Sequence, residues 1–390
     1  MRRTLTLTLA LLTWAGCSTP VAPTPTPVST AAPATGSPSG PRTAPDGRPF
    51  VVEELDDFDE PWAMAFLPSG ELLVTDRGGS LRLRGVDGRT VELSGVPEVV
   101  AEGQGGLGDI IASPGFASDR TVYLSWAEPG DGGTGAVVGR ARLAGTSEAP
   151  ELTGLQVIWR QQPKTSGSGH FGHRLTFAPD GAYLFVSSGD RQKFDPAQDL
   201  GTNLGKILRL NPDGSPAAGN PWAEQGGVTA EVWTQGHRNP LGLAFDPAGN
   251  LWSTEMGPQG GDELNLIEAG RNYGWPKASN GSHYGGGDIP DHRDGDGFAP
   301  PATFWTPSIS PGSLMVYTGD AFPQWQGDAF IGALSGKALV RVDLSGTTAT
   351  AGDTWQMGQR IREVEQAPDG SIWLLEDAPG GRLLRLAPPS

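Results

Sequence analysis

The sequence contains a single cysteine, Cys17, among its 390 residues. An intramolecular disulfide is therefore excluded, whatever compartment the protein occupies. The fold has to be held together by its apolar core and its hydrogen bonds. Histidine is scarce as well, with five in the chain, so two of them close together are informative.

Basic residues are also few, with 28 lysines and arginines against 44 aspartates and glutamates. The formal net charge of −16 at pH 7 argues against nucleic acid or an anionic membrane surface as a partner, because both carry negative charge themselves. A solvated acidic surface is a sufficient explanation for the excess of carboxylates.

Beyond the first residues, no run is apolar enough to span a bilayer. The chain begins with Arg2-Arg3, an apolar run over 5–14 and Ala15-Gly16, directly before Cys17. This order is typical of a bacterial lipoprotein signal, and it predicts a signal peptide over 1–16 and lipidation of Cys17 after cleavage. Trp14 stands where that motif usually has Leu, Val or Ile, so plain secretion is the alternative. Either outcome predicts export, with the lipoprotein held on the cell envelope.

Residues 17–49 have hardly an apolar side chain after Cys17 and consist mostly of Pro, Thr, Ser and Ala. Such a segment cannot bury enough apolar surface to offset the entropy lost on ordering. We therefore expect a disordered tether that holds the folded part off a membrane, with the lipid as its only contact with the bilayer.

Glycine and proline, in contrast, are abundant, at 58 and 35 residues, and they disfavour a mainly helical fold. From residue 50 onward one pattern returns six times: an apolar alternating run, a turn containing proline, and a second run. The prolines of the six returns are Pro68, Pro114, Pro179, Pro247, Pro323 and Pro368. Alternating runs joined by Pro-Asp-Gly-like turns are typical of β-hairpins.

A hairpin repeat of this length indicates a β-propeller. Residues 50–390 would supply six blades of about 57 residues each, more than four strands need. The sequence therefore predicts an all-β, six-bladed β-propeller over 50–390, with surplus length in loops of the third, fourth and fifth repeats. Nearly every residue suited to chemistry lies in those insertions, as expected when function is carried by loops on a rigid scaffold.

Two glycine-rich loops carry polar side chains. Glu102-Gly-Gln-Gly-Gly-Leu-Gly108 surrounds the single amide of Gln104, and glycines let a backbone approach a ligand closely, although a flexible hairpin loop is the alternative. Ser166-Gly-Ser-Gly-His170-Phe-Gly-His173 delivers two histidines just before a strand. An imidazole suits general-base chemistry at neutral pH; a zinc pair and a structural histidine bonded to backbone remain open.

One polar stretch indicates an anion site beside an oxygen-rich cation site. Arg238 and Asn239 precede Gly257-Pro258 by about twenty residues, and that turn leads into Asp262-Glu263. Arginine offers a fixed fork of donors to carboxylates, and turn carbonyls with carboxylates are ligands that Ca²⁺ prefers. A loop of ordinary turn residues with a solvated acidic pair is the alternative.

Two further segments carry several charged side chains. Arg360 and Arg362 alternate on one face at the start of a strand, so they need an anionic partner or face solvent. The segment 291–297, Asp-His-Arg-Asp-Gly-Asp-Gly, resembles part of a calcium loop but lacks its terminal glutamate. We expect the latter segment to be a solvated loop.

Together these loops resemble the soluble quinoprotein sugar dehydrogenases that use pyrroloquinoline quinone (PQQ), in particular the aldose sugar dehydrogenase branch. The resemblance extends from about Trp62 to Arg385. It consists of eight motifs in family order: Trp62-Ala-Met-Ala-Phe-Leu-Pro, Glu102-Gly-Gln-Gly-Gly-Leu-Gly, His170-Phe-Gly-x-Arg174, Gly236-x-Arg-Asn-Pro240, Glu255-x-Gly-Pro258 with Asp262-Glu-x-Asn265, Asn272-Tyr-Gly-Trp-Pro276, Pro307-Ser-Ile-x-Pro311 and Arg360-x-Arg362. The family fold is a six-bladed propeller, in agreement with the repeat count.

The resemblance implies a role for each motif residue. His170 would be the base that takes the anomeric hydroxyl proton while hydride passes from sugar C1 to the quinone, and Gln104 would touch substrate and cofactor. The PQQ carboxylates and quinone oxygens would be held by Arg238, Asn239, Ser308, Arg360 and Arg362. The carbonyls of Gly257 and Pro258 would bind a catalytic Ca²⁺, and Glu263 with the Tyr273 carbonyl a structural Ca²⁺.

The chain departs from the family pattern at a few positions. Gly169 stands where the glucose dehydrogenase branch has an aspartate that orients the base. The cofactor-binding lysine of that branch has no match, since Ser335 falls at its place and Lys337 two positions beyond. Leu241 replaces a usual glutamine, and His173 a usual glycine or serine.

The leading functional hypothesis is a PQQ- and Ca²⁺-dependent dehydrogenase that converts aldoses to aldonolactones and passes electrons to an external acceptor. A metal-dependent lactonase on a similar propeller and a non-catalytic propeller binding module are the alternatives. Arg360 and Arg362 favour the dehydrogenase, because a lactonase needs only a metal and water. We expect a monomer or a dimer.

Overall fold

The computed structural model describes Ala44 and residues 46–389. Cys17, the predicted signal peptide and nearly all of the predicted tether lie outside the described residues. No helix in the part of the chain that is described is long and apolar enough to cross a membrane.

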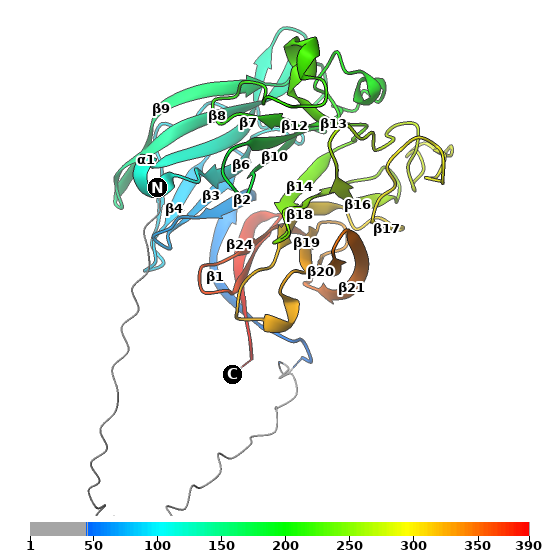
Figure 1. Ribbon diagram of the computed structural model, residues 1–390. Helices are drawn as coiled ribbons and strands as arrows, with labels where there is room; N and C mark the ends of the chain where they lie inside the picture. Colours follow the sequence, from blue (N-terminus) through cyan, green and yellow to red (C-terminus); the bar gives the residue numbers. More distant parts are fainter. Residues whose placement is uncertain (1–43, 45, 390) are drawn as a thin grey trace, which may run out of the picture. The chain divides into compact units, whose positions relative to one another are not determined.

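Six four-stranded antiparallel sheets make up the fold and are arranged as the blades of a propeller (Figure 1). Five blades are built from four consecutive strands, with the innermost strand first. They are β2 (Pro61–Phe66), β3 (Leu72–Asp76), β4 (Leu81–Arg84), β5 (Thr90–Glu92); β6 (Leu107–Ala112), β7 (Thr121–Gly130), β8 (Gly133–Thr146), β9 (Ala149–Arg160); β10 (Gly172–Phe177), β11 (Leu184–Ser188), β12 (Lys206–Leu210), β13 (Val232–Gln235); β14 (Pro240–Phe245), β15 (Leu251–Glu255), β16 (Asp262–Ile267), β17 (Thr303–Trp305); β18 (Pro311–Val316), β19 (Ala329–Ala333), β20 (Ala338–Ser345), β21 (Thr348–Gln356).

The sixth blade combines both ends of the described chain. It contains β22 (Ile361–Gln366), β23 (Ile372–Glu376) and β24 (Pro379–Ala387), and β1 (Val51–Asp59) pairs antiparallel with β24 as its outermost strand. The predicted all-β, six-bladed propeller is therefore confirmed. Helices are short: α1 (Phe116–Asp119), η1 (Asp195–Gln198), η2 (Ala223–Gln225), η3 (Gly227–Glu231) and η4 (Pro323–Trp325).

Each of the six sequence repeats corresponds to the hairpin formed by the first two strands of one blade. Pro68 lies in the turn between β2 and β3, for example, and Pro247 in the turn between β14 and β15. The surplus length lies one blade earlier than predicted, in the second to fourth blades. The second blade uses it in its long strands β7, β8 and β9, and the fourth in the loop between β16 and β17.

The apolar core is divided into six main clusters, each between two neighbouring blades. Leu73 of the first blade packs with Ile110 of the second, and Ile331 of the fifth packs with Trp252 of the fourth. Strands near the axis are covered on both sides, which explains why β3, β11 and β15 are buried along their whole length. Burying these apolar faces provides the main force that holds neighbouring blades together.

Arg174, on β10, connects the innermost strands at the propeller axis. It contacts one residue on each of the other five, namely Trp62 (guanidinium carbon 4.6 Å from the ring centre), Asp109 (3.2 Å), the Leu241 carbonyl (2.8 Å), the Gly312 carbonyl (3.2 Å) and Glu363 (2.8 Å). Burial raises the pKa values of Asp109 and Glu363, the latter to about 7, and Arg174 opposes that shift. The ion pairs with Arg174 therefore favour the ionised form of Asp109 and Glu363 at the centre of the fold.

We expect Arg174→Met to lower the free energy of unfolding by about 3–5 kcal/mol at neutral pH. The reason is that it leaves two buried carboxyl groups without their cation. Arg142→Met is the matched control, because Arg142 is exposed on β8 and a surface change of this kind costs at most about 0.5 kcal/mol. Chemical denaturation measures both. Equal losses in the two variants would contradict a central role for Arg174.

Candidate functional site

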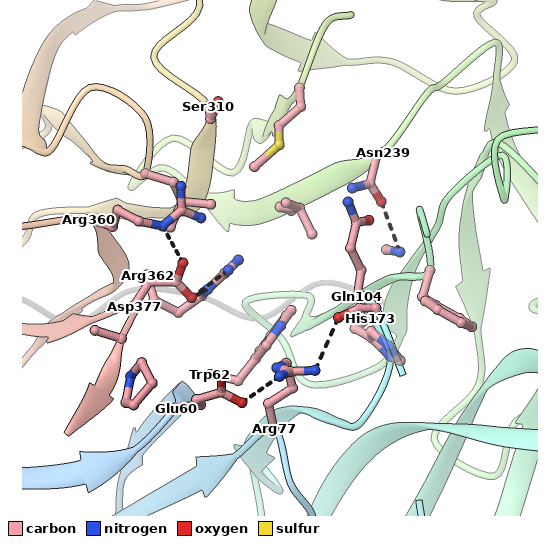
Figure 2. Close-up of a pocket in the computed structure, with 18 residues that line it drawn as sticks. Glu60, Trp62, Arg77, Gln104, His173, Asn239, Ser310, Arg360, Arg362 and Asp377 are labelled. Carbon is pink, nitrogen blue, oxygen red and sulfur yellow. Dashed lines mark hydrogen bonds and ion pairs between the residues drawn. The ribbon is translucent and has the colours of Figure 1, made fainter. Parts of the chain in front are cut away.

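A cavity of about 370 Å³ lies at the end of the axis where the innermost strands begin (Figure 2). We call it the arginine cavity. Its lining comes from five blades and from the loop that leads into the second blade, and it includes Trp62, Arg77, Gln104, His173, Asn239, Leu241, Ser310, Arg360, Arg362 and Asp377. A propeller brings these positions together because every blade places the start of its first strand at the same end of the axis.

Arg360 and Arg362 lie side by side in this cavity and share one carboxylate, as Figure 2 shows. Arg360 donates from Nε to Asp377 (2.6 Å), and Arg362 donates to the same residue from Nε (3.0 Å) and Nη2 (2.7 Å). Burial disfavours the charge on Asp377, but the two arginines hold the pKa of this carboxyl below its usual value. Both Nη groups of Arg360 and Nη1 of Arg362 donate to no described residue, so they are available to an anion.

Gln104 is fixed from two sides. Its backbone N–H donates to the Ser168 carbonyl (2.7 Å), and its side-chain oxygen accepts from the backbone of His170 (2.7 Å). Arg77, ion-paired with Glu60, holds the same loop through the carbonyls of residues 101 and 103. The amide NH₂ of Gln104 is thereby left for a ligand.

The side chain of Asn239, like that of Gln104, is held through its oxygen, which accepts from the Gly172 N–H (3.1 Å). Its NH₂ donates to no described residue. Arg238, its neighbour in sequence, points elsewhere. It donates to the Met256 carbonyl (3.0 Å) and lines a second cavity. These two consecutive residues therefore line two neighbouring cavities.

The second cavity, about 250 Å³, contains His170, and we call it the histidine cavity. His170 Nδ1 lies 2.7 Å from Asp190 Oδ1, and the other oxygen of Asp190 accepts from Trp275 Nε1 (2.7 Å). A carboxylate accepts hydrogen bonds, so Nδ1 carries the proton and the Nε2 lone pair remains free, the state required of a base. Asp190, which the sequence did not single out, takes the orienting role that Gly169 cannot fill. The available signal was a carboxylate two residues after a buried strand.

Arg191 fixes the backbone that carries His170. Its guanidinium donates to the carbonyls of Gly169 (2.6 Å) and Gly167 (2.7 Å) and to Thr134 Oγ1 (2.7 Å), and it lies 3.7 Å from the centre of the Phe171 ring. Both His170 (φ 51°) and Arg191 (φ 54°) adopt left-handed backbone conformations. Such conformations persist only where surrounding contacts impose them.

The two histidines of the loop have different environments. Burial lowers the pKa of His170; Asp190 raises it in part, and the nearby Arg238 and Arg191 lower it further. Burial lowers the pKa of His173 to about 3, and neither of its ring nitrogens has a hydrogen-bond partner. His173 stacks on Phe171 at 5.3 Å and forms an apolar wall of the arginine cavity. Both rings are neutral at pH 7.

Gly257 and Pro258 present carbonyls that accept no hydrogen bond from a described residue. Asp262 shapes this turn by accepting from Gly257 N–H (2.9 Å), and its other oxygen accepts from Ser308 Oγ (2.6 Å) and from the backbone N–H groups of residues 309 and 310. The hydroxyl of Ser308 is therefore used within the protein. Ser310 lines the arginine cavity in its place, and neither Ser335 nor Lys337 reaches that cavity.

Glu263 and Tyr273 border a third, water-sized cavity of about 10 Å³. The Tyr273 carbonyl accepts no hydrogen bond from a described residue, and burial raises the pKa of Glu263. His292 Nε2 lies 3.6 Å from Glu263. The loop over 291–297 is exposed except for His292 and Asp296, whose side chains are 4% and 11% exposed. No three His, Cys, Asp or Glu side chains of the described chain converge as metal ligands. A hard cation here would thus depend on carbonyl oxygens.

Comparison with known proteins supports the resemblance. The Glucose / Sorbosone dehydrogenase family profile matches residues 58–385. An aldose sugar dehydrogenase of Escherichia coli (strain K12) is 42% identical over 347 residues, covering 86% of this chain and 92% of the relative. The apo crystal structure of the soluble E. coli aldose sugar dehydrogenase has a TM-score of 0.83 at 41% identity, covering 87% of this chain and all of that one. The PQQ-bound aldose sugar dehydrogenase from Streptomyces coelicolor gives 0.72 at 30% identity, covering 87% and 98%.

We expect the ring protons of His170 to titrate in NMR spectra with a midpoint below that of the unfolded protein, about 6.5. Asp190→Asn should lower the midpoint further, because it removes the charge that favours the imidazolium. A depressed pKa means that the folded state binds fewer protons than the unfolded state. The contribution of His170 to stability is therefore complete above about pH 6.5 and is lost as the pH falls. A midpoint above that of the unfolded chain would contradict the assignment.

Proposed function

The chain belongs to the glucose/sorbosone dehydrogenase family, and on that premise we propose that it is a PQQ- and Ca²⁺-dependent aldose dehydrogenase. The reaction oxidises C1 of the sugar to the aldonolactone, and the electrons pass to an external acceptor. The observation that carries this proposal is a neutral histidine, oriented by a buried carboxylate, in the cavity next to one with free guanidinium donors.

The arginine cavity fits PQQ, an ortho-quinone with three carboxylates. Its volume of about 370 Å³ lies within the range of roughly 300–1,000 Å³ that small-ligand pockets occupy. Arg360 and Arg362 would hold carboxylates through their free Nη groups, and the NH₂ groups of Asn239 and Gln104 would meet oxygens. The shared Asp377 fixes the two guanidinium planes before the ligand arrives, which reduces the entropy lost on binding.

The carbonyls of Gly257 and Pro258, which accept no hydrogen bond from a described residue, would hold a Ca²⁺ ion, with further oxygens supplied by the ligand and water. Glu263 and the Tyr273 carbonyl fit a second, structural Ca²⁺. When bound, PQQ supplies the hydride acceptor and Ca²⁺ polarises it as a Lewis acid. Ser308, whose hydroxyl is committed to Asp262, would support the site through that contact.

His170 performs the proton transfer in this proposal. Its Nε2 takes the proton of the anomeric hydroxyl as hydride leaves C1, so that the sugar loses one hydride and one proton in total. Asp190 stabilises the imidazolium that forms, because it already accepts from Nδ1. The neighbouring Arg238 and Arg191 disfavour that positive charge and help to return the proton to solvent. Burial of the ring limits competing protonation by water.

We expect His170→Gln to lower turnover by roughly 10²–10⁴, the amount that a positioned base contributes, with unchanged binding of PQQ. His173→Gly should lose far less, because His173 has no polar partner. Dye reduction by protein reconstituted with PQQ and Ca²⁺ measures turnover, with bound PQQ quantified by absorbance. The wild-type rate should fall with acid as His170 protonates, at a midpoint below about 6.5.

Two results would contradict this assignment. Near-normal turnover of His170→Gln together with an inactive His173→Gly would place the base at the other histidine. Binding of PQQ by the wild-type protein without oxidation of any aldose would indicate a non-catalytic binding module.

We expect removal of Ca²⁺ to abolish activity and to lower the melting temperature. A cation bound only to the folded state stabilises it by about 2.7 kcal/mol at a free concentration of 100 Kd. Glu263→Gln should need more Ca²⁺ than the wild type to regain the same melting temperature, because it loses a charged ligand. Asp291→Asn, a carboxylate exposed in the neighbouring loop, is the control and should titrate like the wild type. Indifference of both activity and melting to exhaustive chelation would exclude the two sites.

A further inference from the structure

A lysine with no exposed surface begins β12. The ammonium of Lys206 donates to the carbonyls of Pro196 (2.7 Å), Ala197 (3.1 Å) and Leu204 (2.7 Å), and the residue is 0% exposed. An ammonium has three N–H donors and no acceptor, so these carbonyls satisfy it completely. It forms no ion pair with a described residue. We call the ammonium and its three carbonyls the lysine clamp.

Holding a charge at this position is costly. Burial lowers the pKa of Lys206 to about 7, and Asp199 offsets that shift only in part. A methionine would fill a similar volume without a charge, but it would leave the three carbonyls without this donor. Two of the carbonyls belong to η1, a single helical turn of four residues that is not stable without tertiary contacts. The favourable effect of the ammonium is therefore to fix η1.

The position of η1 decides where Trp275 lies. Ala197 of η1 packs with Trp275 and Ile289 in a small buried cluster. Gln198, the last residue of η1, donates from Nε2 to the Trp275 carbonyl (2.6 Å). Movement of η1 would therefore move the indole ring as well.

Trp275 in turn holds the carboxylate that orients His170. Its Nε1 donates to one oxygen of Asp190 (2.7 Å), and the other oxygen lies 2.7 Å from His170 Nδ1. Lys206 is also connected to this carboxylate through the sheet, since it pairs with Ser188 on β11, two residues before Asp190. Lys206 lines neither the arginine cavity nor the histidine cavity, so any effect on the reaction has to pass through other side chains.

We propose that Lys206 is a positioning residue for the proton transfer. Its ammonium holds η1 against Trp275, and Trp275 keeps Asp190 in the orientation that the hydrogen bond with His170 requires. This inference rests on the proposed function and adds to it a residue that touches neither substrate nor cofactor.

We expect Lys206→Met and Lys206→Ala to lower turnover about 10- to 100-fold, the cost of a small misplacement of a catalytic group. KM for glucose and the binding of PQQ should change little. The midpoint of the His170 titration in NMR spectra should fall in both variants, because a displaced Asp190 favours the imidazolium less. Removal of a positive charge without displacement would raise the midpoint instead. Lys277→Ala, which removes an exposed lysine two residues after Trp275, is the matched control and should behave like the wild type.

Chemical rescue isolates the role of the ammonium. Lys206→Ala removes the atoms of propylammonium, so added propylammonium should restore the His170 midpoint and most of the turnover. The uncharged 1-propanol should restore neither. Lys206→Met fills the space and should not respond to propylammonium, and it tests the role of the charge if the alanine variant does not fold.

Three results would overturn this inference. They are a wild-type midpoint and turnover in Lys206→Met, a lowered melting temperature with an unchanged midpoint, and a rescue by 1-propanol that equals that by propylammonium. A lowered midpoint that propylammonium restores in Lys206→Ala supports the link to His170 even if the wild-type protein oxidises no aldose. That combination would contradict the proposed function alone.

Discussion

The site depends on six strands meeting at one axis, and Arg174 is the residue that joins them. Apolar packing acts only between neighbouring blades, so it fixes each blade against the next. A guanidinium with five donors can contact all of the remaining innermost strands at once. Because the cavity with Arg360 and Arg362 opens directly beside this hub, a change in the angle between blades would move its walls apart.

Much of this architecture follows from the sequence, because it depends on turn residues and apolar alternation that are local in the chain. Each blade begins with a hairpin whose proline-containing turn recurs six times, and the alternation of apolar residues fixes which faces are buried. Gln104 and Asn239 could be placed on loops, and Arg360 and Arg362 at the start of a strand, for the same reason. The sequence shows how much length exceeds four strands per blade, but this surplus lies one blade earlier than predicted. Long strands and long loops both add residues, so a residue count does not tell them apart.

The two acidic residues that the sequence did not single out, Asp190 and Asp377, act on groups elsewhere in their own blade. Each looks ordinary in the printed sequence, yet Asp190 orients a histidine and Asp377 fixes a pair of arginines. Asp262, expected beside a cation, instead accepts a hydrogen bond from the Gly257-Pro258 turn. The partners lie between 5 and 20 residues away, at separations that turns and strand pairing within one blade determine. Likewise Ser308 and Ser310 differ by two positions in sequence, and only the turn around Asp262 decides which of them faces the cavity.

The pairing of β1 with β24 also bears on how the protein is made. β1 is synthesised before all the other described strands, and its neighbour in the sheet, β24, is the last of them to emerge from the ribosome. Until β24 emerges, β1 has no partner, and the first and sixth blades cannot form their shared core. The nascent chain can build blades one after another, but the ring stays open until β24 has been synthesised, with a strand edge exposed to other chains. Closure is thus a single late event, and the axial site is assembled only when it occurs.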